Sequence, residues 1–494
     1  MSTHHYLACD LGAESGRVIL GTLADGKVSI EEIHRFPTGA STILGSMRWD
    51  VLRIFDELKT GLRKAAQRNL PIASVSTDSW GVDYVLLAGK EPMLGLPYHY
   101  RDARLDGGLE RAFKKVPAET IFDETGIQFM QINTIYQLIA DLEQRPELLK
   151  LAEQFLTIGD YFNFLFSGVR KVEVSLASTT QAYNPRTRSW SKKLIKNFKL
   201  PAKIFPEIVA SGTKLGAVLP AIAAETGLPA EVQVVASCSH DTGAAVAAVP
   251  AEGGQDWAYL SSGTWSLLGV ESAEAIINEK SRQYNFTNEI GVGHSVRFLK
   301  NIIGLWVLQE CRRAWEKAGQ TYDYAQLAGL AEKAPALQRF INPAAARFYK
   351  PDDMPKKIAD YCRETGQKPP EGVGETVRCV LESLALLYDK TLKEFADATG
   401  RTFSRLHIVG GGCKNTLLNQ LSANATQIPV HAGPVEGTAI GNILIQALGL
   451  GHLSSLDELR KVVRDSFPVT VYQPQDAAAW HQAKERFQSL TLNT

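Results

Sequence analysis

The chain has 494 residues, of which 45% are hydrophobic and 21% are charged. This length exceeds what one hydrophobic core usually serves, so the chain is expected to form two large domains. Lysine plus arginine and aspartate plus glutamate each total 53, a balance that argues against nucleic acid, a membrane surface or an acidic protein as the partner.

The cysteines and the N-terminal region favour a cytoplasmic protein. The six cysteines are scattered and form no C-x-x-C pair, which is typical of reduced thiols, although a bond between Cys362 and Cys379 stays open. Asp10 and Glu14 interrupt the only apolar run near the N-terminus, and no apolar run reaches about 18 residues. We therefore expect no signal peptide, no membrane span and a cytoplasmic location.

The first predicted elements are short strands joined by tight turns. Strands are expected at 6–10, 17–23 and 27–35, with Asp25-Gly26 as the turn of the second hairpin. The stretch 72–89 repeats the pattern of an apolar run, a polar tip and a second apolar run. Residues 133–157 carry apolar side chains at helical spacing on both sides of Pro146.

The second half of the chain repeats this order of elements. A strand at 231–236 leads through a polar turn into an alanine-rich helix that ends at Pro250. A second strand–turn–strand unit follows at 257–272. Strand, turn and helix then recur at 405–426 and at 428–451. The proline and paired glycines of 248–257 predict a connector, so we place two domains at 1–248 and 249–494.

Several common catalytic motifs are absent. The sequence has no G-x-x-x-x-G-K-[ST], no H-E-x-x-H and no G-x-S-x-G. The triple glycine at 410–412 is followed by Asn415 where a dinucleotide fingerprint needs glycine, which disfavours a dinucleotide-dependent dehydrogenase. His407 stands alone in a strand, where a packed histidine is a more common interpretation than a metal ligand.

Two turns, one in each half, have the composition of phosphate-binding loops. In "DLGAESGR", Gly12 and Gly16 allow the backbone to turn its N–H groups toward an anion, and Asp10 could hold Mg²⁺ through water. "SSGTWS" at 261–266 opens the second half in the same way. Each turn could also be an ordinary polar hairpin tip, but the pair together indicates a phosphate held from two sides.

Two further stretches could carry chemistry. The glycines of "VGGGCKN" at 409–415 would let a flat ligand such as adenine approach the backbone, or would serve packing alone. In "SHDTGAAVAAV", Asp241 could cap the following helix, act as the general base for a sugar hydroxyl, or do both. The helix N-terminus is expected to keep its pKa low, and phosphoryl transfer asks for little basicity.

With these stretches in order, the chain resembles the FGGY family of carbohydrate kinases nearly from end to end. Seven stretches resemble the branch of that family that phosphorylates L-rhamnulose. They are "STDSWGVDYVLL" (76–87), "GLPYHYRDAR" (95–104), "ETGIQFMQINTIYQL" (124–138), "SCSHDT" (237–242), "YLSSGTWSLLG" (259–269), "LKNIIGLWVLQE" (299–310) and "LHIVGGGCKNTLLNQL" (406–421).

The resemblance implies an α/β fold of two actin/hexokinase-like, ribonuclease H-like domains with a central interdomain cleft. It assigns sugar binding, the first phosphate loop and the base to the N-terminal domain, and the second phosphate loop and adenine side to the C-terminal one. Trp80, Tyr98 and Tyr100 would line a sugar pocket or, alternatively, pack in the core.

The residues that match the family's functional positions are few. They are Asp241 as catalytic base; Ala13, Glu14, Ser15, Gly16, Arg17, Thr264, Gln309 and Gly411 for ATP; and Gly81, His240, Asp241, Thr242 and Asn301 for the sugar. Glu14 departs from the family, where many relatives carry Ser or Thr, and is expected to face solvent. Asp10 would hold Mg²⁺ through water.

The expected activity is ATP-dependent, Mg²⁺-requiring phosphorylation of L-rhamnulose at its 1-hydroxyl, in L-rhamnose catabolism. The partners would be the ketose and ATP, with no nucleic acid and no membrane, in a monomer or weak homodimer. Alternatives are another ketose (L-fuculose, L-xylulose or L-ribulose) or a nucleotide-gated binding protein of the actin kind.

Overall fold

The computed structural model describes residues 3–492, which fall into two compact units. The first unit contains the chain up to residue 248 together with 271–298 and 437–466. The second contains 249–270, 299–436 and the chain from 467 onward. The first passage between units thus coincides with the predicted domain boundary, and the division of the whole chain into 1–248 and 249–494 stays a prediction.

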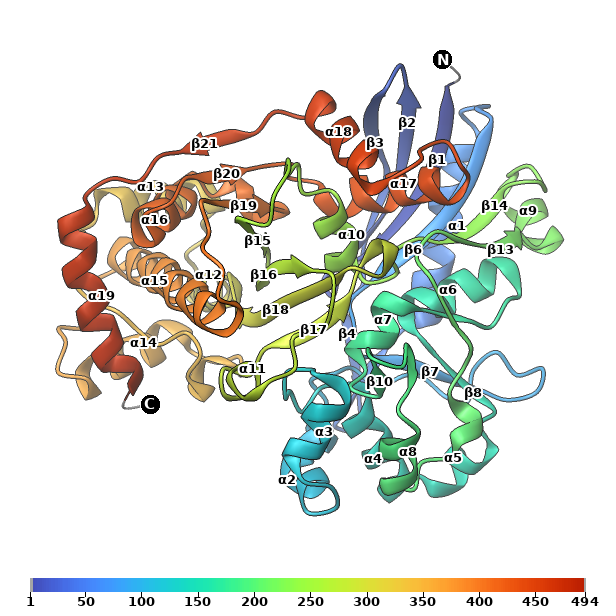
Figure 1. The fold of residues 1–494 in the computed structure, drawn as a ribbon, viewed down its shortest axis with the longest axis horizontal. Coiled ribbons are helices and arrows are strands. Elements are labelled where there is room, and N and C mark those ends of the chain that lie inside the picture. The colour runs from blue at the N-terminus through green and yellow to red at the C-terminus, as the bar shows by residue number, and fades with distance from the viewer. Residues whose placement is uncertain (1–2, 493–494) are drawn as a thin grey trace. The chain divides into compact units, whose positions relative to one another are not determined.

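The first unit is built on a six-stranded sheet in the order β13-β14-β6-β1-β2-β3. The blue strands of Figure 1, β1 (His4–Leu11), β2 (Ser15–Ala24) and β3 (Lys27–Pro37), form the antiparallel series that the sequence predicts. Asp25 and Gly26 both have positive φ at the β2–β3 turn, as a two-residue hairpin turn requires. β6 (Ile72–Ser79) and β14 (Gln233–Ala236) continue the sheet in parallel with β1.

Helices cover both faces of this sheet. One face carries Leu7 and Cys9 of β1, which share a core with Leu58 of α1 (Val51–Ala66) and Phe162 of α6 (Ile158–Ser167). On the other face, α17 (Gly437–Gly449), coloured red in Figure 1, lies beside β1 although more than 400 residues separate them in the chain. Because side chains alternate along each strand, the sheet has one apolar face, and its opposite face makes polar contacts with α17.

The first unit also has a smaller core, in which the antiparallel pair of β7 and β8 packs against α4. The remaining bounds are β4 (Ala40–Ile43), β5 (Ser46–Trp49), β7 (Tyr84–Leu87), α2 (Gly108–Phe113), α3 (Ala118–Thr125), α4 (Thr134–Gln144), α5 (Pro146–Leu151), β8 (Gln154–Thr157), β9 (Val172–Glu173), α7 (Val174–Thr179), β10 (Tyr183–Asn184), β11 (Ser189–Trp190), α8 (Lys192–Asn197), β12 (Ile208–Val209), β13 (Thr213–Ala217), α9 (Pro220–Thr226), α10 (Asp241–Ala247), α11 (Glu279–Gln283), β17 (Thr287–Ile290) and α18 (Leu456–Ser466).

The second unit has its own sheet, in which β16-β15-β19-β20-β21 are consecutive neighbours. β15 and β16 form the predicted hairpin, and β19 and β20 run parallel to β15. The long helix α15 packs against α13 and α16. The bounds are β15 (Trp257–Ser262), β16 (Trp265–Ser272), β18 (Val296–Ile303), α12 (Trp306–Lys317), α13 (Tyr324–Lys333), α14 (Met354–Glu364), α15 (Val373–Thr399), β19 (Arg405–Val409), α16 (Thr416–Thr426), β20 (Val430–Ala432), β21 (Thr470–Tyr472) and α19 (Ala477–Leu492).

One predicted element needs correction. Helical spacing was expected through 133–157, but the chain breaks at Arg145, restarts as α5 at Pro146 and then enters β8. A short apolar run is compatible with either a helix or a strand, and hydrogen bonding to β7 makes residues 154–157 a strand. None of the helices described between residues 3 and 492 is long and apolar enough to cross a membrane.

All six cysteines are buried, and none is in a disulfide. Cys362 and Cys379 lie in side-chain contact without a bond between them, so the reduced state of the thiols stays a prediction.

Candidate active site

The β1–β2 turn carries the first predicted phosphate loop. The Gly12 N–H donates to the Ser15 carbonyl at 3.0 Å and closes the turn, so Ala13 and Glu14 form its tip. Thr38, fully buried at the end of β3, braces the turn: its N–H donates to the Glu14 carbonyl and its hydroxyl to the Gly12 carbonyl. Glu14 is exposed, as expected. The backbone at this tip is thus fixed by the sheet beneath it.

Gly16 is required by packing beneath this tip. A Cβ on Gly16 would lie 2.5 Å from the Phe36 ring and 2.8 Å from Leu11, inside van der Waals contact. The glycine therefore allows β2 to run close to β3 directly after the turn.

Acidic side chains gather beneath the same turn, where β1 and β6 end side by side. Asp10 lies opposite Arg17 on β2, with which it forms an ion pair, and opposite Asp78 on β6. Asp78 is fully buried, and Asn442 of α17 donates to its Oδ2 at 2.5 Å. Burial and the neighbouring Asp10 raise the pKa of Asp78 well above its usual range. The register of two parallel strands brings these carboxylates together.

Asp241 is the first residue of α10, and His240 occupies the N-cap position. This corrects the interpretation of Asp241 as the cap. The pKa of Asp241 is also raised, whereas the helix N-terminus was expected to lower it. Burial is the main cause of the increase, Asp10 adds repulsion, and His240 and hydrogen bonds from Thr242 act in the opposite direction. The carboxylate is thus a stronger base than its position on the helix alone predicts.

The neighbours of Asp241 include three predicted sugar residues. Thr242 donates from both its N–H and its hydroxyl to Asp241 Oδ1, and His240 Nε2 lies 3.5 Å from that oxygen. Gly81 lies beside the same imidazole: a Cβ there would be 3.4 Å from His240 Nε2 and 3.3 Å from Thr179 Oγ1. The first unit therefore brings Gly81, His240, Asp241 and Thr242 into one cluster.

Two buried carboxyl groups that the sequence analysis missed support the turn before Asp241. Glu173 accepts from the Ser239 N–H at 3.0 Å, and Asp160 accepts from the Ser239 hydroxyl at 2.9 Å. Burial, together with repulsion from Glu173, raises the pKa of Asp160 to about 8. Ser175, itself bonded to Glu173, accepts from the His240 N–H. These contacts fix the backbone from which His240 and Asp241 project.

A second missed pair lies on the other side of His240. Glu289 of β17 and Arg297 of β18 are 4% and 0% exposed, and Arg297 Nη2 lies 3.1 Å from Glu289 Oε2. His240 Nδ1 lies 3.2 Å from each of these two atoms. The local sequence around residues 289 and 297 gives no sign of a site, because the contact forms only in the folded unit.

The aromatic residues expected to line a sugar pocket are mostly buried. Trp80 and Tyr100 belong to the core of the first unit, together with Trp49, which the sequence analysis did not single out. Asp83 organises them by accepting from both indole N–H groups and from the Tyr100 N–H, and burial raises its pKa to about 6. This burial favours the packing alternative for Trp80 and Tyr100.

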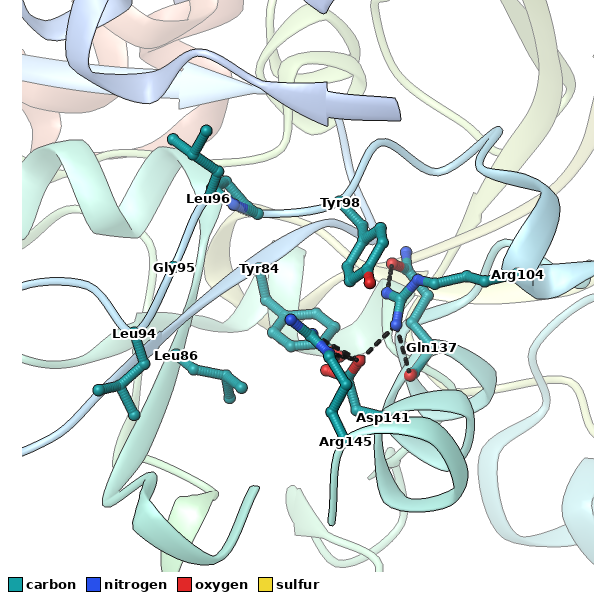
Figure 2. A pocket seen from close by; sticks show the side chains of 11 residues that line it. Tyr84, Leu86, Leu94, Gly95, Leu96, Tyr98, Arg104, Gln137, Asp141 and Arg145 are labelled. Carbon is teal, nitrogen blue, oxygen red and sulfur yellow. Dashed lines mark hydrogen bonds and ion pairs between the residues drawn. The ribbon is translucent and has the colours of Figure 1, made fainter. Parts of the chain in front are cut away.

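Figure 2 shows a polar layer in which Gln137 accepts from Arg104 at 3.1 Å and Arg104 also pairs with Asp141. Gln137 also donates to Asp83 Oδ1 at 2.8 Å, which joins this layer to Asp83. The Arg104 guanidinium lies 3.6 Å from the centre of the Tyr98 ring. The Tyr98 ring therefore makes a cation–π contact with Arg104. Through Gln137, α4 is hydrogen-bonded to Asp83 of the "WGVD" stretch.

The second unit positions the residues predicted for the nucleotide. Thr264 lies in the β15–β16 turn, where its carbonyl accepts from the Gly304 and Trp306 N–H groups at 3.1 Å each. Gln309 of α12 donates to the Thr264 hydroxyl at 3.2 Å. Asn301, predicted for the sugar, lies in β18 and is partly buried. Thr264 and Gln309 therefore form one local cluster.

The triple-glycine turn after β19 packs against the same hairpin. A Cβ on Gly412 would lie 2.0 Å from the Ser262 hydroxyl, and one on Gly410 would lie 3.0 Å from the Ser262 carbonyl. A Cβ on Gly411 would meet no atom within 4 Å. Gly410 and Gly412 are thus explained by packing, whereas Gly411 leaves open space at the position predicted for ATP.

Comparisons with known proteins agree with this arrangement. Residues 5–248 match the N-terminal domain of the FGGY family of carbohydrate kinases, and residues 258–450 match its C-terminal domain. A rhamnulokinase of Halalkalibacterium halodurans is 42% identical over 96% of this chain and 99% of its own length. A rhamnulokinase of Bacteroides thetaiotaomicron is 40% identical over 98% and 99%.

Among solved structures, a xylulose kinase from Lactobacillus acidophilus superposes with a TM-score of 0.81 over 99% of this chain and 98% of that one. At 16% identity this likeness concerns the fold alone. It confirms the predicted two-domain α/β fold of the actin/hexokinase-like class.

Proposed function

Because the chain belongs to the FGGY family of carbohydrate kinases and is an ATP-dependent sugar kinase, we propose that it converts L-rhamnulose to L-rhamnulose 1-phosphate in L-rhamnose catabolism. The observation that carries this proposal is the set of relatives named rhamnulokinase, which are about 40% identical over nearly the whole chain. The solved xylulose kinase is far more distant in sequence, so it gives no support to L-xylulose as the substrate.

In the proposed reaction Asp241 is the general base. Its carboxylate accepts the proton of the sugar 1-hydroxyl while that oxygen bonds to the γ-phosphorus and the bond to the β-phosphate oxygen breaks, which releases ADP. The raised pKa of Asp241 suits this role, since it narrows the gap to the hydroxyl that must lose its proton. The two bonds from Thr242 orient the carboxylate.

We assign the phosphates of ATP to the turn Ala13–Arg17 and to Thr264, with Gln309 and Gly411 beside the nucleotide. Two features support this: the turn at 12–15 is braced by Thr38, and Gly411 leaves open space where a Cβ would otherwise stand. Arg17 pairs with Asp10 beneath the turn and keeps a cation there. Because Glu14 is exposed, we infer that the turn acts through its backbone N–H groups.

Mg²⁺ fits the acidic group beneath the first turn. Asp10 offers carboxylate oxygens, and within the described residues Asp78 Oδ1 is buried without a hydrogen-bond partner. Mg²⁺ in kinases is commonly held by one or two carboxylates, water and phosphates, so no dedicated cage is needed. We propose that Asp10 holds the ion through water. When bound, the ion neutralises charge on the transferred phosphoryl group.

Gly81, His240, Thr242 and Asn301 are the proposed sugar contacts. A side chain at Gly81 would stand against His240 Nε2, the nitrogen that lies 3.5 Å from Asp241 Oδ1. Hydrogen bonds from buried donors discriminate strongly between sugars that differ in a hydroxyl. We infer that this cluster selects the ketose.

An ADP-release assay over L-rhamnulose, L-fuculose, L-xylulose and L-ribulose tests the substrate. We expect the highest kcat/KM for L-rhamnulose and no turnover without Mg²⁺. A higher kcat/KM for another ketose would make that ketose the substrate instead. The control is the same enzyme preparation, saturated with each sugar in turn.

We further propose a cytoplasmic location, no nucleic-acid or membrane partner, and a monomer or weak homodimer. The scattered, buried cysteines, none of them in a disulfide in the structure, support a reducing compartment, and the equal numbers of acidic and basic residues support the absence of polyanionic partners. Sedimentation at several concentrations would give the oligomeric state.

A further inference from the structure

His240 is held by two ionic side chains that no predicted site includes. Arg297 is fully buried, and its guanidinium also lies 3.3 to 3.4 Å from the Ile290 carbonyl and from where a Cβ of Gly243 would stand. Glu289 is nearly as buried and faces the same guanidinium. A buried ion pair is costly to desolvate and weak evidence for stability, so its position against a proposed substrate residue needs a reason.

The contacts on the two ring nitrogens restrict where His240 carries its proton. An arginine N–H can only donate, so Arg297 Nη2 favours an Nδ1 that carries no proton and accepts, whereas Glu289 Oε2, 3.2 Å from the same nitrogen, favours a proton there. On the opposite edge, Nε2 lies 3.5 Å from Asp241 Oδ1, an oxygen that can only accept when ionised. The neutral ring with its proton on Nδ1 could donate to Glu289 Oε2, but that proton would also face the Arg297 N–H donor. Its bare Nε2 would then face the acceptor oxygen of Asp241, so this state is disfavoured.

The remaining protonation states share one feature. A neutral ring that accepts from Arg297 carries its proton on Nε2, and a charged ring that donates to Glu289 carries protons on both nitrogens. In each of them Nε2 is a hydrogen-bond donor directed at the side where Asp241 and Gly81 lie.

We propose that Glu289 and Arg297 are positioning residues that keep a proton on His240 Nε2, so that this nitrogen donates to the oxygens gathered around Asp241 during phosphoryl transfer. This inference rests on the proposed function. In the sugar-bound state the Nε2–H would donate to a hydroxyl oxygen of the ketose. Glu289 would neutralise the charge of the Arg297 guanidinium, which is buried away from solvent.

The kinetic test replaces the pair together by Glu289→Met and Arg297→Met, because a buried ion pair is tolerated better as two apolar side chains than as one stranded charge. We expect kcat for the ketose to fall roughly 10-fold or more, since orientation of a reacting group is lost, with KM for ATP unchanged. The control is the double variant Glu271→Met and Arg460→Met, which removes another ion pair of the same unit, at 2.8 Å, and should keep the wild-type kcat.

The spectroscopic test uses ¹⁵N-imidazole histidine in the full chain, with His240→Gln to assign the signals. We expect Nε2 of His240 to be protonated in the wild type and expect the single variant Arg297→Met, which leaves Glu289 alone beside Nδ1, to move the proton to Nδ1. A wild-type ring protonated only at Nδ1, or wild-type turnover in the folded double variant, would overturn the proposal.

The two tests separate this inference from the proposed function. A wild-type chain without activity on L-rhamnulose would remove the proposed substrate, while the ¹⁵N spectrum would still show which nitrogen carries the proton.

Discussion

At the scale of single residues, the candidate site depends on how burial and neighbours tune Asp241. Its position at the start of α10 would by itself favour a low pKa, but partial burial and the nearby Asp10 raise it. His240 and Thr242 oppose this increase. The result is a carboxylate that binds a proton more readily than an ordinary aspartate and that lies in the same cluster as His240 and Gly81.

Replacing Asp241 by Asn keeps the shape of the side chain and removes the base. We expect turnover to fall at least ~100-fold, the usual size of a general-base contribution. Coupled ADP-release kinetics measure it, and unchanged thermal unfolding would show that the variant folds. In the wild type, kcat/KM should decrease as the pH falls through the raised pKa, since protonation removes the acceptor. Near wild-type turnover of the folded variant would refute the role.

Replacing Gly81 by Ala tests whether the absence of a side chain beside His240 matters for the ketose. The added Cβ would stand 3.3 Å from Thr179 Oγ1 and 3.4 Å from His240 Nε2, closer than most Cβ contacts. We expect KM for the ketose to rise roughly 10-fold, which corresponds to the lower part of the cost of overpacking, while KM for ATP stays the same. An equal change in both KM values would show that the substitution acts on the fold instead.

At the scale of elements, the strand–turn–helix unit at 233–247 is held by side chains from distant segments. Ser239 bonds to Glu173 and Asp160, which are 66 and 79 residues away along the chain. Asn442 of α17 bonds to Asp78 of β6 across 364 residues. Each of these contacts supports a turn that carries a proposed site residue.

Replacing Asp160 by Asn should change how stability depends on pH. The folded chain holds a proton on Asp160 with a pKa of about 8, far above the unfolded value, so this group's contribution is complete at low pH and is lost as the pH rises toward 8. The slope is at most ~1.4 kcal/mol per pH unit. Between pH 6 and pH 9, the free energy of unfolding of the variant should therefore rise relative to that of the wild type as the pH increases. A constant difference would contradict the buried proton.

The substitution Gly441→Ala should destabilise the contact between α17 and α10. A Cβ at Gly441 would lie 1.8 Å from the Ala244 carbonyl oxygen, so one helix must move. We expect a loss of about 1–3 kcal/mol in urea unfolding. The matched control is Gly329→Ala in α13, where a Cβ meets nothing and the helix should gain up to ~1 kcal/mol. If both variants were equally stable, the close approach of α10 and α17 would be wrong.

These contacts also explain how far the sequence alone could lead. The Asp25-Gly26 hairpin, the turn after β19 and the helix that begins at Asp241 after an apolar strand follow from local patterns, and the structure contains all three elements. Glu173, Asp160, Glu289 and Arg297 have ordinary local surroundings and acquire meaning only through partners that are distant in the chain. The roles of the site residues stay predictions, because hydrogen bonding within the chain does not by itself reveal a ligand.

At the scale of the whole molecule, the first unit is completed by a late segment of the chain. Residues 437–466 supply α17 and α18 to the sheet that begins at residue 4. Gln446 and Asn442 of α17 bond to the backbone of β1 and to Asp78 of β6. The polar face of the sheet thus has its hydrogen-bond partners in the last quarter of the sequence.

A fragment of residues 1–248 tests the predicted domain division. Without α17 the polar groups of β1 and β6 on that face lose their partners, so we expect the fragment to unfold at lower urea than the first unit of the full chain. Adding residues 437–466 through a flexible linker should restore part of the stability. Equal midpoints for the bare fragment and the full chain would establish 1–248 as an independent domain.

The return of α17 to the first sheet has a consequence for synthesis on the ribosome. Once residue 248 has emerged, about 200 further residues must be translated before the helix that covers β1 and β6 exists. At roughly 5–20 residues per second this takes about 10 to 40 s. During that interval the nascent chain presents an uncovered sheet face, so its early folding should depend on how well chaperones shield it and on the speed of translation.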